Sequence, residues 1–277
     1  MTADLGESIA DLALVDNHVH GFWMSTTDRR GFENGLNEAN TEPLAEFDSG
    51  FDTQIGFAVR AHCAPLLGLP PHTDPDEYLV RRSGFRATEL AEIFRRAAAA
   101  ARWRDGGGVR LTDRVLLRFG IHQALRLGKP LQFHVGLGDR DCDLHRTNPL
   151  LLLDFLRQSG AIPIVLLHCY PYEREAGYLA QAFNNVYLDT GLTINHLGAR
   201  AAAFLSRSLE LAPFRKILYS SDAYGPPELH YLGARLWRGA VTRVLTGFVS
   251  GGQWSPGDAV RVARLIGRDN AMRLYRL

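Results

Sequence analysis

Two histidines separated by one residue, His18 and His20, are the first side chains in the sequence that could bind a metal ion. Residues two apart on an extended segment point to the same side, so both imidazoles can reach one ion, and Gly21 lets the backbone turn away. One such pair could be incidental, but three later apolar runs also end in ligand-type side chains: His134, His168 and Asp222. Imidazoles with one carboxylate suit Zn²⁺, with Mn²⁺ or Fe²⁺ as alternatives. The pattern predicts a divalent metal site.

The segments that must position these side chains are short and almost continuously apolar, as expected of buried parallel strands. Five are predicted: Ala13–Asn17, Pro130–Val135, Ile162–Leu167, Val186–Leu188 and Ile217–Ser221. Helix-patterned segments lie between the later runs, over 149–159, 175–183 and 200–211. This alternation indicates an α/β fold, either a (β/α) barrel or a doubly wound sheet. In both folds the site gathers at the carboxyl ends of the strands.

The interval 21–129 breaks the alternation. Residues 22–50 are polar and predict a long loop, and an amphipathic segment follows over 53–67. Helices are predicted over 88–104 and 113–127, the second with Thr112 as its cap. An eight-stranded barrel would need about three strands in this interval, and the pattern predicts none. We therefore expect one domain over 1–277, in which residues 21–129 are atypical and mostly loop and helix.

Composition narrows the class of protein. A chain of 277 residues suits one large α/β domain, and its 31 basic side chains nearly balance its 30 acidic ones. This balance favours neither nucleic acid nor an anionic membrane as a partner. Three dispersed cysteines predict neither disulfides nor a cysteine zinc cage. With no apolar run long enough to span a bilayer and no leader pattern, we expect a soluble, cytoplasmic, unprocessed protein.

Several motifs resemble those of a known family. The His-x-His pair, single histidines after later strands and an aspartate after the last strand are similar to the amidohydrolase superfamily. More narrowly, three segments resemble its amidohydrolase-2 group, and in particular the FluG-type amidohydrolase domain found fused to glutamine synthetase: Gln132–Asp139, Leu167–Tyr178 and Asn185–Asp189. The similarity runs almost continuously from Asp113 to the C-terminus.

The resemblance implies a distorted (β/α)₈ barrel, of the TIM type, with a metal at the carboxyl ends of its strands. By matching position, His18 and His20 would be ligands after strand one, His134 after strand five and Asp222 after strand eight. Asp222 would also be the general base for water activation. His168 would bind a second metal or, in a one-metal site, hydrogen-bond the water or the substrate carbonyl.

Similar proteins usually carry strands two to four in the interval 21–129, so the resemblance implies a barrel that is internally shortened here and lacks those strands. The same interval lacks the residue that bridges two metals in some relatives, which favours one ion, with zinc as the first expectation. The expected activity is hydrolysis of a C–N (amide or amidine) or lactone-like bond in a small anionic molecule. A non-oxidative decarboxylase of the same family is the alternative, and a non-catalytic binding or regulatory domain is a second one. Besides a small-molecule substrate, the expected partners are a second copy of the chain or a glutamine-synthetase-like protein.

Three further side chains are weaker candidates for substrate binding. His145 and Arg146 could hold a substrate carboxylate or phosphate through the guanidinium fork. Equally, they could cap the neighbouring Asp143. His196, near Asp189 and Asn195, could line the pocket, although turn chemistry explains these residues as well.

Overall fold

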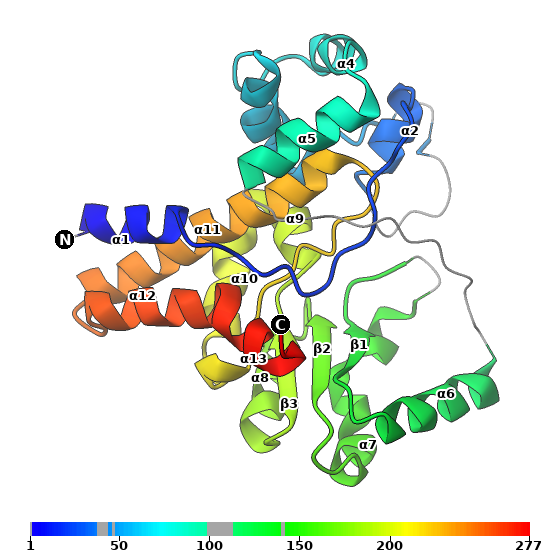
Figure 1. Cartoon of the computed structure of the whole chain (residues 1–277), viewed down its shortest axis with the longest axis vertical. Coiled ribbons are helices and arrows are strands. Elements are labelled where there is room, and N and C mark those ends of the chain that lie inside the picture. The colour runs from blue at the N-terminus through cyan, green and yellow to red at the C-terminus, as the bar shows by residue number, and fades with distance from the viewer. Residues whose placement is uncertain (1, 38–43, 46–47, 99–112, 140–141) are drawn as a thin grey trace.

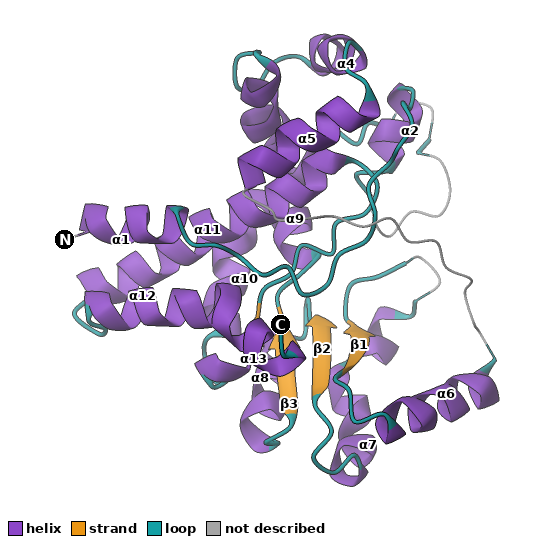
Figure 2. Ribbon diagram, in the orientation of Figure 1, coloured by secondary structure: helices purple, strands orange, loops and turns teal. Residues whose placement is uncertain are grey.

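The computed structural model describes residues 2–37, 44–45, 48–98, 113–139 and 142–277. Its four strands form one parallel sheet in the order in which they occur along the chain (Figures 1 and 2). The strands are β1 (Leu131–Val135), β2 (Ile164–His168), β3 (Val186–Asp189) and β4 (Ile217–Leu218). Each strand lies within a predicted apolar run or extends one residue beyond it, so four of the five predicted strands are confirmed.

Helices make up most of the remaining described chain. Those before the sheet are α1 (Thr2–Ala10), α2 (Arg29–Asn34), α3 (Gln54–Ala58), the π-helix η1 (Val59–Cys63), the 3₁₀ helix η2 (Ala64–Leu67), α4 (Pro75–Ser83), α5 (Ala87–Ala98) and α6 (Arg114–Arg126). Those within and after the sheet are η3 (Leu144–Thr147), η4 (Pro149–Leu152), α7 (Leu153–Gln158), α8 (Glu173–Ala182), α9 (Thr193–Leu197), η5 (Gly198–Arg200), α10 (Ala201–Ser208), η6 (Phe214–Lys216), α11 (Pro227–Ser250), α12 (Pro256–Arg264), the π-helix η7 (Leu265–Asp269) and α13 (Asn270–Tyr275). None of these helices is long and apolar enough to cross a membrane.

The sheet separates two cores, because successive side chains of a strand point to opposite faces. Ile164 and Leu166 of β2 belong to the main core, together with buried side chains of α7, α8 and α10. Val165 and Leu167 belong to a smaller core on the other face, with Leu218 of β4 and Ala271 of α13. In a closed barrel this second face would look onto further strands. Here the C-terminal helix α13 packs against it.

A third core lies beyond the carboxyl ends of the strands, where α2, α4 and α5 gather in the upper part of Figure 1. Its buried aromatic side chains, Phe32, Phe51, Tyr78 and Phe94, pack with Leu232 of α11. The long helix α11 therefore joins this helical layer to the sheet, since its later residues, such as Trp237, belong to the main core. This arrangement places a helical cover over the edge of the sheet where a site is expected.

The interval 21–129 contains helices and, among its described residues, no strand apart from a single parallel bridge between Phe22 and Gly225. The expectation that strands two to four are not evident is confirmed for that part of the chain. The predicted long loop over 22–50 is wrong in one respect, because it contains α2. Asp28 caps this helix by accepting a hydrogen bond from Gly31 N. The predicted cap Thr112 lies outside the described residues, and Asp113 caps α6.

The fifth predicted strand, Ala13–Asn17, is an irregular segment and pairs with none of the strands in the described part of the chain. Val15 N donates at 2.8 Å to Gly267 O, which belongs to the π-helix η7. The carboxylate of Asp16 accepts from Ser221 N at 2.9 Å. A side chain thus takes the main-chain donor that a neighbouring strand would have used, which ends the ladder at this position.

Candidate metal centre

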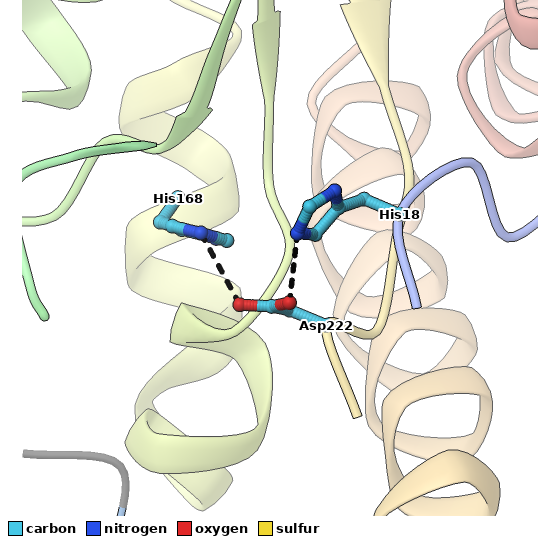
Figure 3. Close-up of side chains that lie close together, drawn as sticks. All are labelled: His18, His168 and Asp222. Atoms are coloured by element: carbon cyan, nitrogen blue, oxygen red, sulfur yellow. Dashed lines mark ion pairs between the residues drawn. The ribbon is translucent and has the colours of Figure 1, made fainter. Parts of the chain in front are cut away.

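Three imidazoles converge on one buried carboxylate at the carboxyl ends of the strands. Nε2 of His18 lies 3.0 Å and Nε2 of His20 lies 3.1 Å from Oδ1 of Asp222. Nε2 of His168 lies 3.2 Å from the other oxygen, Oδ2. Figure 3 shows His18 and His168 on the same side of the carboxylate, each directed at one of its two oxygens. The structure therefore brings together four of the five predicted ligands.

These four side chains come from three separate segments of the chain. His168 is the last residue of β2, Asp222 follows β4 in the loop before α11, and His18 and His20 stand on the irregular segment after α1. His168 and Asp222 have φ angles of 68° and 47°, in the left-handed region that is unfavourable for residues with a Cβ. The Asp222 backbone is held there by donation from its N–H to His18 O at 3.0 Å. Such strain at a convergence of polar groups is typical of functional sites.

Neighbouring polar groups hold the loop that carries Asp222 and the ring of His18 in place. Asp16 accepts hydrogen bonds from the backbone N–H and, at 2.5 Å, from the hydroxyl of Ser221, next to Asp222. Nδ1 of His18 lies 2.9 Å from Oε1 of Gln132. Hydrogen bonding of the second ring nitrogen is how proteins orient metal-binding histidines.

The charges in the cluster depend on one another. Burial raises the pKa of Asp222, but the His18 and His20 imidazoles lower it more, so the carboxylate stays ionised. Burial lowers the pKa of His18, but Asp222 and Gln132 outweigh burial and raise it to about 9. Burial lowers the pKa of His168 to about 3, so this ring is neutral. A divalent cation would take the place of the His18 proton, because only neutral imidazoles and ionised carboxylates bind metals.

The donor set fits a metal ion. Single donor atoms of His18, His168 and Asp222 all lie within 4.8 Å of one another. Asp222 Oδ1 and His168 Nε2 are buried, and neither makes a hydrogen bond of normal geometry with any described residue. Buried polar atoms without such partners are costly unless another ligand satisfies them. Two imidazoles and a carboxylate are the ligand types of catalytic zinc sites, with His20 beside them.

The remaining predicted residues lie at different distances from this cluster. The ring centroid of His134 is 4.3 Å from that of His168, but its Nε2 is hydrogen-bonded to Leu137 O at 2.6 Å and does not join the donor group. Arg146 is exposed and pairs with Asp143 at 3.4 Å, which supports the local alternative; His145 lies beside it in η3 and is also exposed. His196 in α9 has a pKa lowered to about 4 by burial, with Asp222 acting in the opposite direction.

Two residues important to this site were not among the predicted ones. Asn17 donates to Asp189 Oδ2 at 2.8 Å, and Gln132 contacts His18 as described above. A signal for Gln132 was present, because it stands two residues before His134 and therefore on the same face of β1. Asn17 had no such signal, since its partner lies 172 positions away in the sequence.

The chain is similar to proteins of one enzyme family. The model of the family described as amidohydrolase matches residues 37–277. Protein fluG of Emericella nidulans is 37% identical over 179 residues, which are 61% of this chain and 21% of that protein. An uncharacterised metal-dependent hydrolase TatD of Mycobacterium tuberculosis is 30% identical over 130 residues, 46% of this chain and 43% of that one. The matches thus span less than half the length of these two relatives.

Two crystal structures share the fold. A proposed metal-dependent hydrolase from Lactobacillus casei superposes with a TM-score of 0.79 at 21% identity, over 98% of this chain and 97% of that one. Uronate isomerase from Thermotoga maritima superposes with a TM-score of 0.57 at 13% identity, over 99% and 97% of the two chains. The first similarity extends over nearly the whole of both chains, so the overall arrangement found here also occurs in an experimentally determined structure.

Proposed function

This chain belongs to the amidohydrolase family and is a hydrolase, and from that premise we propose that His18, His20, His168 and Asp222 bind one divalent ion, zinc in the first instance, to activate water. The observation that carries the proposal is the convergence of three imidazole nitrogens on the one buried carboxylate. His134 lies against His168 and could add a further nitrogen by turning its ring away from Leu137 O.

In this proposal the side chains divide the chemistry between them. When bound, a divalent ion acts as a Lewis acid that makes water acidic enough to lose a proton near neutral pH. Asp222 accepts that proton, because its low pKa keeps the carboxylate ionised, and passes it to the leaving group. His168 is neutral, so it can serve as a ligand or donate a hydrogen bond to a substrate carbonyl. The bond proposed to break is a C–N or lactone-like bond of a small anionic molecule.

Removing the metal is expected to lower stability as well as activity. Protein expressed without a histidine tag should contain about one zinc-class ion per chain by elemental analysis. After chelation, readdition of zinc at 100 times its dissociation constant should raise the free energy of unfolding by about 2.7 kcal/mol. Thermal unfolding with and without zinc measures this effect.

The matched control changes an exposed histidine of α6 outside the cluster. His122→Ala should keep the metal content and the zinc-dependent stabilisation, whereas His18→Ala with His20→Ala should lose both. A chain without stoichiometric metal, unaffected by the double change, would contradict the proposed function.

Reaction products separate hydrolysis from its alternative within the same family. The zinc-loaded chain should open an aryl lactone such as dihydrocoumarin or cleave a chromogenic anilide. Release of CO₂ from aromatic carboxylates, without ring opening or amide cleavage, would instead support the decarboxylase. The buried, ionised carboxylate favours hydrolysis because it provides a base for water.

A further inference from the structure

The C-terminal helix α13 reaches the metal centre through a chain of hydrogen bonds. The hydroxyl of Tyr275 lies 2.6 Å from Nε2 of Gln132 and 3.1 Å from Oδ1 of Asn17. Gln132 in turn contacts His18, and Asn17 precedes His18 directly. Tyr275 packs against the smaller core, with Val165 and Leu167, on the face of the sheet that α13 covers. Its hydroxyl therefore meets the polar groups behind the metal ligand.

The direction of every hydrogen bond in this chain follows from one main-chain carbonyl. Nδ2 of Asn17 lies 2.6 Å from Tyr219 O and 2.8 Å from a carboxylate oxygen of Asp189. A carbonyl can only accept, so the amino group of Asn17 must face it and the amide oxygen must face Tyr275. The single hydroxyl proton of Tyr275 is then donated to Asn17 Oδ1.

The same reasoning fixes the next two groups. Because its proton is used on Asn17, the Tyr275 oxygen accepts from Gln132, so the amino group of Gln132 faces the tyrosine. The amide oxygen of Gln132 is then left to face His18 Nδ1 at 2.9 Å. An oxygen in that place requires the proton of His18 on Nδ1, which leaves the Nε2 lone pair directed at the site.

We propose that Tyr275 is a positioning residue for the metal centre: it holds the Gln132 amide in the one orientation that keeps His18 in its metal-binding tautomer. If the amide inverted, its amino group would face His18 Nδ1 and the ring proton would move to Nε2, where it blocks ligation. Without the hydroxyl, the only other described group opposing inversion is Asn17 Oδ1, 3.4 Å from Gln132 Nε2. This inference rests on the proposed metal site and assigns to it a residue from the opposite end of the chain.

Removing one hydroxyl tests the proposal. Tyr275→Phe should weaken zinc binding by about ten-fold or more, the range found for outer-shell partners of metal-binding histidines. The measurement is the zinc dissociation constant by competition with a chromophoric chelator, with thermal unfolding of the metal-free protein beside it. Tyr187→Phe is the matched control, because Tyr187 packs in the same core and its hydroxyl makes no hydrogen bond with the part of the chain that the structure describes. The control should bind zinc as the unchanged chain does.

A second background distinguishes positioning from packing. In the Gln132→Glu background both terminal atoms of the side chain are oxygens, so turning the group over cannot present a donor to His18. Adding Tyr275→Phe to it should leave zinc affinity unchanged, although any packing defect would persist. Equal weakening in both backgrounds, or unweakened binding by Tyr275→Phe alone, would overturn the role of the tyrosine. Failure of the unchanged chain to bind zinc would overturn the proposed function as well, so the two failures are distinguishable.

Discussion

Asp222→Asn is expected to abolish hydrolysis by the zinc-loaded chain, because one change removes a ligand charge and the proposed base. Loss of a general base alone costs about 10²- to 10⁴-fold in rate. The loss should be larger here, since three imidazoles lie within 3.2 Å of this carboxylate. The measurement is kcat/KM for dihydrocoumarin opening, together with zinc content by elemental analysis.

Asparagine isolates the chemical role of Asp222 from its backbone conformation. Asparagine tolerates the left-handed region well, so the φ of 47° at this position should be retained. Glu210→Gln is the matched acid-to-amide control, because Glu210 lies at the surface, where it pairs with Arg174. The control should retain zinc and activity. An Asp222→Asn variant that kept both would show that the base and the ligand lie elsewhere.

Glu228→Ala is expected to lower the free energy of unfolding strongly. The Glu228 side chain is fully buried at the start of α11, and its Oε1 accepts from Arg82 Nε at 2.6 Å and from the Tyr78 hydroxyl at 3.0 Å. The Arg82 guanidinium also lies over the ring of Phe32, 4.5 Å from its centroid. Removing one partner leaves a buried charge unpaired, which costs about 3–5 kcal/mol. Urea unfolding measures the loss.

Two comparisons make this prediction specific to the buried pair. Replacing both partners by leucine should recover much of the loss, since the cost comes from the unpaired charge rather than from the missing attraction. Asp154→Ala removes an exposed pair with Arg157 at 2.8 Å and should leave stability nearly unchanged. If Glu228→Ala were as mild as Asp154→Ala, the pair would not anchor the helical cover to α11.

The sequence predicts the sheet well because buried parallel strands are apolar on both faces. The runs that became β1, β2, β3 and β4 needed no tertiary information to be recognised. Ala13–Asn17 has the same local pattern, yet it is not a strand, since the Asp16 carboxylate takes the backbone donor of Ser221. That contact joins residues 205 positions apart, and no local pattern encodes it.

The site was predictable to the same extent as the segments that carry it. His18, His20, His168 and Asp222 follow apolar segments and meet in the structure as expected. Ring orientation was not predictable, because the position of His134 Nε2 depends on the turn that brings Leu137 O to it. The support from Tyr275 was also hidden, since it requires α13 to cover a face of the sheet that a closed barrel would fill with strands.

The hydrogen bond between Asn17 and Tyr275 joins positions 258 residues apart. During synthesis the first histidines leave the ribosome long before the tyrosine does, and contacts this distant in sequence form late in folding. A nascent chain therefore carries exposed imidazoles without the groups that fix their tautomer until the residues through Tyr275 have emerged. On the proposed role of Tyr275, tight metal capture requires α13 to be docked on the sheet, so partly folded chains should bind zinc weakly.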